Sequence, residues 1–166
     1  YFRNGENPTA IVARLRLLSA RLKGMKPTEV DQTTKQILEL AQKADLPHIQ
    51  QFATVMIADG FQNRGENQKA IDLLSSFYQQ NPSSVDAQLF QKRIVANINE
   101  KIKNEVESTQ FLQALKTYEK FSDGWLKSSK RLDTQYFLGR AYEQAGVPTE
   151  AARYYRHVLN KVYALQ

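Results

Sequence analysis

Cysteine is absent from this chain of 166 residues. Disulfides, thiolate metal sites and cysteine nucleophiles are therefore excluded. The absence fits a reducing or an oxidising compartment, so the location stays open. No apolar run approaches the roughly 18 residues that a membrane-spanning helix needs, and no signal peptide is visible.

Glycine and proline are scarce, at seven and five residues, and runs of β-branched residues are rare. This composition favours long helices with short connections over strands. Hydrophobic residues make up 42% of the chain, which is typical of a folded domain and argues against disorder. We therefore expect an all-α protein with a single domain over residues 1–166.

Apolar residues at helical spacing, interrupted by proline and glycine, predict about eight helices. They are expected at residues 8–23, 29–44, 47–64, 67–81, 85–106, 108–121, 132–145 and from 148 towards the end. The expected caps at helix starts are Asn7, Thr28, Asn67 and Ser108. Gly65 and Gly146 are expected to end two helices. Because no amphipathic helix can bury its stripe alone, neighbours must stack in series as antiparallel pairs.

Two stretches, residues 51–82 and 132–163, share one spacing of small and aromatic residues. The first spaces its residues by 3, 9, 4, 3 and 5 positions, at Ala58, Phe61, Ala70, Leu74, Phe77 and Pro82. The second repeats the spacings 3, 9, 4 and 3, at Gly139, Tyr142, Ala151, Tyr155 and Val158. Small residues let two helices approach closely, and aromatic residues fill the gap between pairs. On this pattern the chain resembles tetratricopeptide-repeat proteins, which implies an α-α superhelix, a TPR-like solenoid.

The pattern departs from that family in several places. Residues 84–121 resemble a degenerate pair with a lengthened first helix, and the repeats are not spaced by multiples of 34 residues. Thr54 and Gln135 stand where the family has tryptophan. Gly5 to Asn7 precede Ala10 as Gly65 to Asn67 precede Ala70. This echo leads us to expect a fragment of a longer protein that begins midway through a repeat.

The resemblance implies a protein or peptide partner in a concave groove lined by the first helix of each pair. The matching positions are Phe52, Val55, Asp59, Gln62, Asp133, Tyr136, Arg140 and Glu143. They mix aromatic, polar and charged groups, as recognition surfaces do. For Phe52 and Tyr136, simple core packing is the alternative interpretation. Family members that grip a C-terminal carboxylate use a Lys and an Asn, which are not at the matching places here, so that ligand is not expected.

The net charge of +6 is partly concentrated near the start of the chain. A basic patch is predicted there at Arg14, Arg16, Arg21, Lys23 and Lys26. Such a patch attracts nucleic acid, anionic lipid or an acidic partner, although a solvated helix face is the simpler interpretation. Basic charge and eight tyrosines make a nucleic-acid-binding helical repeat the second hypothesis. Most aromatic residues sit at packing positions, so we favour a protein partner.

Signs of catalysis are missing from the sequence. His48 and His157 are far apart and have no spaced ligand partner, whereas a metal site needs at least three ligands. No phosphate-binding loop or nucleophile motif is present. We therefore expect a non-catalytic scaffold without metal or cofactor.

A structural subunit of a larger envelope or motility assembly is the third hypothesis. The last predicted helix carries more apolar residues than one stripe needs: Tyr154, Tyr155, Val158, Leu159, Val162, Tyr163 and Leu165. This excess makes self-association through the C-terminal helix a further prediction.

Overall fold

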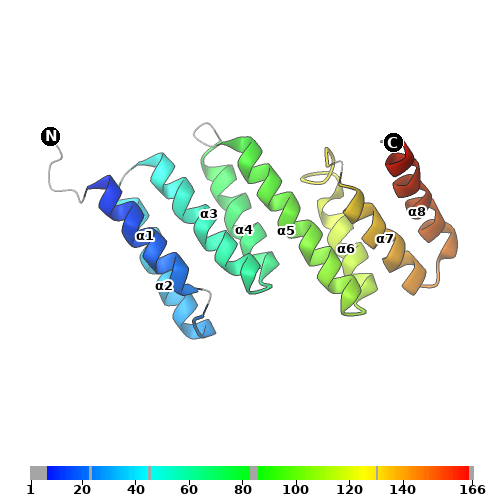
Figure 1. Ribbon diagram of the computed structural model, residues 1–166, viewed down its shortest axis with the longest axis horizontal. Helices are drawn as coiled ribbons and strands as arrows, with labels where there is room; N and C mark the ends of the chain where they lie inside the picture. Colours follow the sequence, from blue (N-terminus) through cyan, green and yellow to red (C-terminus); the bar gives the residue numbers. More distant parts are fainter. Residues whose placement is uncertain (1–6, 23, 45, 83–85, 130, 165–166) are drawn as a thin grey trace. The chain divides into compact units, whose positions relative to one another are not determined.

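The computed structural model of the protein describes residues 7–22, 24–44, 46–82, 86–129 and 131–164. Within these ranges the chain has eight α-helices and no strand, which confirms the all-α prediction. The helices are α1 (Pro8–Leu22), α2 (Pro27–Lys43), α3 (Pro47–Asn63), α4 (Asn67–Gln80), α5 (Ala87–Glu107), α6 (Phe111–Ser122), α7 (Leu132–Gln144) and α8 (Pro148–Tyr163), as labelled in Figure 1. No helix in the described ranges is long and apolar enough to cross a membrane. Gly5, Glu6, Lys23 and Leu165, which entered the predictions above, lie outside the described residues.

The chain forms two compact units, Tyr1–Phe90 and Gln91–Gln166. In the first unit α1 packs on α2 and α3, α2 packs on α3, and α3 packs on α4. In the second unit α6 packs on α7 and α7 packs on α8. Each of these pairs is formed by helices that are consecutive or nearly so in the chain. That order follows from short connections between amphipathic helices.

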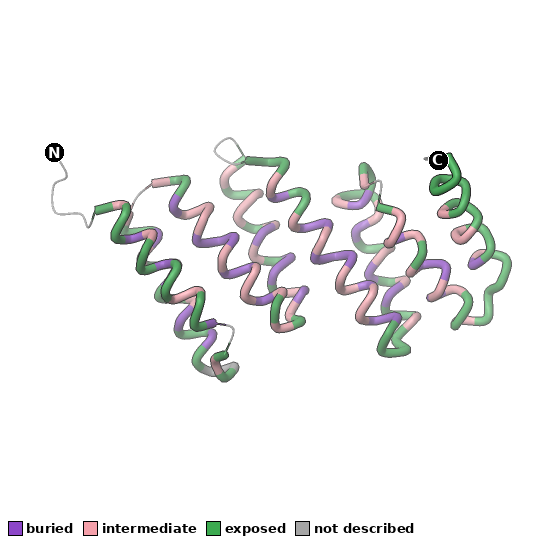
Figure 2. Tube along the Cα trace, viewed as in Figure 1, coloured by how far each residue is buried: buried purple, intermediate pink, exposed green. Residues whose placement is uncertain are grey.

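The core of the first unit consists of aliphatic side chains spaced three or four residues apart. Large aliphatic side chains with less than 2% exposure include Leu15, Leu22, Ile37, Ile49, Ile57, Ile71 and Leu74. Figure 2 shows buried positions recurring along the helices between exposed ones. Full burial of such a side chain contributes roughly 1.5–3 kcal/mol. Helix packing in this unit therefore follows from the apolar stripes.

The core of the second unit depends on a close helix approach as well as on apolar stripes. Ile94, Ile98 and Ile102 of α5 are fully buried. In α7, a Cβ atom added to Gly139 would lie 2.6 Å from the Tyr155 ring of α8. The absence of a side chain at Gly139 thus allows α7 and α8 to pack with the ring between them.

Buried polar contacts join α5 to the next two helices. The Glu105 carboxylate, only 6% exposed, accepts hydrogen bonds from Lys101 at 2.6 Å and from the Thr117 hydroxyl of α6 at 3.1 Å. The Asn99 side chain donates to Asp133 of α7 at 2.9 Å and accepts from the Thr134 hydroxyl at 2.7 Å. These bonds compensate for the burial of Asn99, Thr134 and one Glu105 oxygen, whereas Glu105 Oε2 has no hydrogen-bond partner among the described residues.

Several helix ends agree with the sequence. The Asn7 side chain accepts the backbone N–H of Thr9 at 2.9 Å, which confirms it as a cap of α1. Gly65 and Gly146 both have φ of 75°, where glycine is favoured because it has no Cβ. They follow α3 and α7 as predicted.

Two predicted helix starts are wrong, and so is the cap predicted for α4. Helix α2 begins at Pro27 instead of Glu29, because the Glu29 carboxylate accepts the Lys26 backbone N–H at 3.1 Å and so takes part in the start. Helix α4 begins at Asn67 itself, so this residue follows the cap position. Helix α6 begins at Phe111 rather than directly after Ser108, because the chain turns at Thr109 with φ of 61°.

Candidate functional site

Three of the predicted groove residues of α7 share one face of that helix. Tyr136, Arg140 and Glu143 are spaced by four and three residues, which brings them to the same side. The Tyr136 side chain is 44% exposed, Glu143 is exposed, and Arg140 is partly exposed. This face therefore presents an aromatic ring, a cation and an anion to solvent.

Tyr155 of α8 completes this face, although the sequence analysis predicted it as a packing or self-association residue and not as part of the groove. Its hydroxyl donates to the Glu143 carboxylate at 2.7 Å. Its ring centroid lies 6.0 Å from that of Tyr136. Burial and the Glu143 carboxylate raise the pKa of Tyr155 above its ordinary value, so the hydroxyl stays protonated and keeps donating. The small residue Gly139, which opens the space for the ring, was the available signal in the sequence.

Asp133, the fourth predicted residue on α7, is engaged within the protein. Its carboxylate accepts from Arg131 in an ion pair, from Asn99 at 2.9 Å and from the Thr134 backbone N–H at 3.0 Å. The Arg131 guanidinium lowers the pKa of Asp133 below its ordinary value. Asp133 thus fixes the start of α7, where a negative charge is favourable, and leaves less of its carboxylate to a partner.

The predicted groove residues of α3 are divided between surface and core. Phe52, Asp59 and Gln62 are partly exposed. Val55 is 9% exposed, so its side chain mainly contributes to packing. The Arg16 guanidinium of α1 lies 5.7 Å from the Phe52 ring centroid, a cation–π contact. This surface of the first unit therefore combines a ring and a cation, as the α7 face does.

The cations of the predicted basic patch do not gather on one face of α1. At 100° per residue, Arg14 and Arg21 project within about 20° of each other, whereas Arg16 projects roughly 160° away from Arg14. Lys26 precedes α2 and is exposed, and Lys23 lies outside the described residues. Among them, Arg16 contacts the ring of Phe52, a predicted groove residue.

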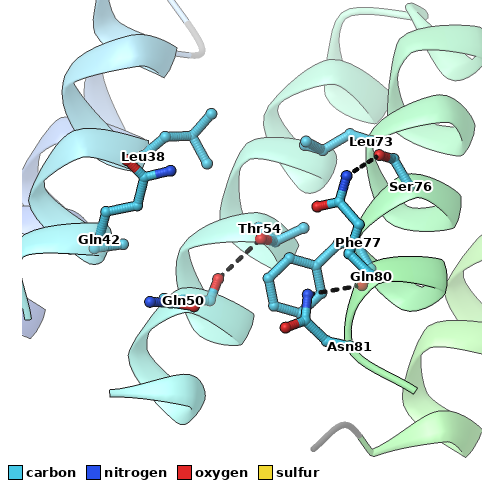
Figure 3. A pocket seen from close by; sticks show the side chains of 10 residues that line it. Leu38, Gln42, Gln50, Thr54, Leu73, Ser76, Phe77, Gln80 and Asn81 are labelled. Carbon is cyan, nitrogen blue, oxygen red and sulfur yellow. Dashed lines mark hydrogen bonds between the residues drawn. The ribbon is translucent and has the colours of Figure 1, made fainter. Parts of the chain in front are cut away.

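A hollow opens between α2, α3 and α4 of the first unit, with a volume of about 330 Å³. This hollow was not predicted from the sequence. Its lining, seen in Figure 3, consists of Leu38, Ala41, Gln42, Gln50, Thr54, Leu73, Ser76, Phe77, Gln80 and Asn81. Its lining combines apolar and neutral polar side chains. Because the residues come from three helices, no single stretch of sequence indicated the hollow.

The described residues contain no cluster of three or more His, Asp or Glu side chains that could hold a metal ion. His48 and His157 are both exposed, on α3 and α8 respectively.

Comparison with known proteins adds no relative. No family model, no curated protein and no solved structure matches this chain. The tetratricopeptide resemblance therefore rests on the spacing of residues alone.

Proposed function

We propose that the chain binds a protein or peptide partner through the exposed faces of α3 and α7. The observation that carries this proposal is the half-exposed Tyr136 ring, which lies against Tyr155 and next to Arg140 and Glu143. Tyrosine and arginine supply much of the binding energy at protein interfaces. A tyrosine ring also offers a large contact area at a low cost in conformational entropy.

The environment of Tyr136 favours a preorganised surface. Its ring makes an edge contact with Phe137, with centroids 5.4 Å apart. Tyr155, its other neighbour, is held by its bond to Glu143. A ring that is already oriented loses less freedom when a partner binds. Such a ring suits recognition of an extended or helical peptide.

The proposal includes a TPR-like superhelix as the fold of the chain. The support is the sequential packing of helices inside each unit and the repeated spacing of small and aromatic residues. In such repeats the first helix of each pair lines the concave side. Helices α3 and α7 are the first helices of the two best-matching pairs.

A protein partner fits these faces better than a nucleic acid. The α7 face includes Glu143, and an exposed carboxylate repels phosphate. The cations of α1 are divided between opposite sides of their helix. A nucleic-acid site needs clustered cations along the backbone path.

The proposal is tested by selecting peptides on the immobilised protein from a random-peptide phage library and measuring the affinity of the selected peptide by calorimetry. We expect the double variant Tyr136→Ala with Arg140→Glu to weaken binding tenfold or more, because it removes a ring and reverses a charge. The control, Gln113→Ala with Lys116→Glu, likewise truncates one side chain to alanine and reverses one positive charge, on exposed positions of α6. Its affinity should equal that of the wild type.

A second double variant, Phe52→Ala with Arg16→Glu, tests the face of the first unit. Weaker binding in both double variants means that both units contact the peptide. Unchanged affinity in both would contradict the proposed site. Binding of single-stranded RNA that weakens steeply with salt, in the absence of any selected peptide, would favour the nucleic-acid hypothesis instead.

A further inference from the structure

The hollow of the first unit lies on the other side of α3 from the proposed peptide-binding face. Gln50 and Thr54 of α3 line the hollow, whereas Phe52 belongs to the proposed face. Successive helix residues are rotated by 100°, so Gln50 and Phe52 project to nearly opposite sides. A ligand in the hollow would therefore occupy a separate site.

No charged side chain lines the hollow. Leu38 of α2 and Leu73 and Phe77 of α4 form apolar walls on two sides, as Figure 3 shows. An ionised ligand would lose hydration there without meeting an opposite charge, which is costly. The walls thus favour an uncharged ligand with an apolar group.

Primary amides supply most of the polar side chains of the lining, beside the hydroxyls of Thr54 and Ser76. Each glutamine side chain offers two N–H donors and one carbonyl acceptor, the same groups that a peptide bond needs as partners. The side-chain amides of Gln42 and Gln50 make no hydrogen bond to any other residue of the described ranges. Gln80 donates one bond to the Ser76 hydroxyl at 3.3 Å. Three amides therefore retain capacity for a ligand.

Thr54 is a buried part of the lining, with 1% exposure. Its hydroxyl donates to the Gln50 backbone carbonyl at 2.8 Å. The volume of about 330 Å³ lies near the lower end of the range for small-ligand sites. It accommodates one large side chain with its adjoining peptide groups and excludes a folded domain.

We propose that this hollow is a second binding site and that it takes an uncharged peptide segment bearing one apolar side chain. The apolar side chain packs between Leu38, Leu73 and Phe77. The amides of Gln42, Gln50 and Gln80 bond to the peptide groups on either side of it. Binding here requires no contact with Tyr136 or Phe52.

The test uses three small probes and NMR spectra of the isotope-labelled full chain. N-acetyl-leucinamide has an apolar side chain between two neutral amide groups, N-acetyl-leucine replaces one amide by a carboxylate, and N-acetyl-glycinamide lacks the side chain. We expect saturable shifts at lining residues with N-acetyl-leucinamide, with a dissociation constant in the millimolar range because the probe is small. The other two probes should bind at least fivefold more weakly.

Two substitutions of α4 locate the binding. Ser76 is exposed and lines the hollow, so Ser76→Trp should fill it and weaken N-acetyl-leucinamide binding tenfold or more. Gln79→Trp puts the same side chain on an exposed position of α4 outside the lining, and should leave the affinity unchanged. If Ser76→Trp does not fold, Gln50→Ala decides, because it removes one amide without adding bulk.

Absence of saturable shifts overturns the proposal. It is also overturned if N-acetyl-leucine binds as tightly as N-acetyl-leucinamide, or if the filled or amide-deleted variant keeps the wild-type affinity. A negative result in this test does not contradict the proposed binding face of α7, because the double variant of Tyr136 and Arg140 is measured with a different ligand.

Discussion

Gly139 sets the distance between α7 and α8. Any Cβ at this position would lie 2.6 and 2.7 Å from two atoms of the Tyr155 ring. The ring is held on its other side by Tyr136 and at its hydroxyl by Glu143. The absence of a side chain at Gly139 therefore determines where the side chains of Tyr136, Glu143 and Tyr155 lie.

We expect Gly139→Ala to lower the free energy of unfolding by about 1–2 kcal/mol. Overpacking of this kind costs roughly 1–3 kcal/mol, and the better helix propensity of alanine returns up to about 1 kcal/mol. Urea denaturation measures the change. The control is Gly124→Ala, where the nearest atom to the new Cβ is 3.9 Å away. A Gly139→Ala protein as stable as the wild type would show that Tyr155 moves aside freely.

The Asp133 carboxylate should make the free energy of unfolding depend on pH. Because Arg131 lowers its pKa in the folded state, its stabilising contribution is complete above the unfolded pKa of about 4 and is lost as the pH falls through the folded pKa. We expect Asp133→Asn to lose less stability than the wild type between pH 7 and about pH 3.

Chemical denaturation across this pH range measures the dependence, with Asp123→Asn on an exposed position as the control. In addition, NMR titration should show a higher pKa for Asp133 in the Arg131→Ala variant. No rise would mean that Arg131 is not the cause.

Helices are the elements that the sequence predicts best here. An apolar period that continues over three or more turns identifies a helix from many residues at once, so all eight were found in order. Helix ends depend on one or two side chains each. The Glu29 carboxylate accepts a hydrogen bond from the Lys26 backbone N–H, and the chain turns at Thr109 with positive φ. The residue type alone, glutamate or threonine, does not predict either role at a helix end.

Thr109 offers a test at the end of α5. Its φ of 61° is unfavourable for a β-branched residue, and the turn is closed by the Gln110 N–H donating to the Glu105 carbonyl at 2.7 Å. We expect Thr109→Gly to stabilise the protein by about 0.5–1 kcal/mol.

The reverse substitution, Gly146→Ala at φ of 75°, should destabilise it by about 1 kcal/mol. Thermal unfolding followed by circular dichroism measures both. A destabilised Thr109→Gly protein would indicate that the turn depends on the threonine side chain itself.

The candidate surfaces were harder to predict than the helices. Tyr136, Arg140 and Glu143 follow from one helical period, so their common face was predictable. The contact between Arg16 and Phe52 joins residues on different helices, and the hollow joins three helices. Such groupings depend on how helices pack, which the local pattern does not specify.

At the scale of the whole chain, the division into two compact units predicts separable unfolding. Leu74 is fully buried in the first unit, and Leu74→Ala should cost that unit about 2–5 kcal/mol. The single tryptophan, Trp125, belongs to the second unit. We expect the variant to shift the circular-dichroism midpoint in urea more than the tryptophan-fluorescence midpoint. Equal shifts would show that the units unfold together.

The paired polar bonds around Asn99 have a mechanical consequence for the second unit. The Asn99 side chain donates one hydrogen bond to the Asp133 carboxylate and accepts one from the Thr134 hydroxyl. Both Asn99 and Thr134 are 3% exposed. Sliding α7 along α5 by one turn would break both bonds at once. The Asn99 amide and the Thr134 hydroxyl would then be buried among aliphatic side chains without hydrogen-bond partners. The two bonds therefore resist sliding of one helix along the other. Under a stretching force, the two helices should separate in one abrupt step rather than gradually.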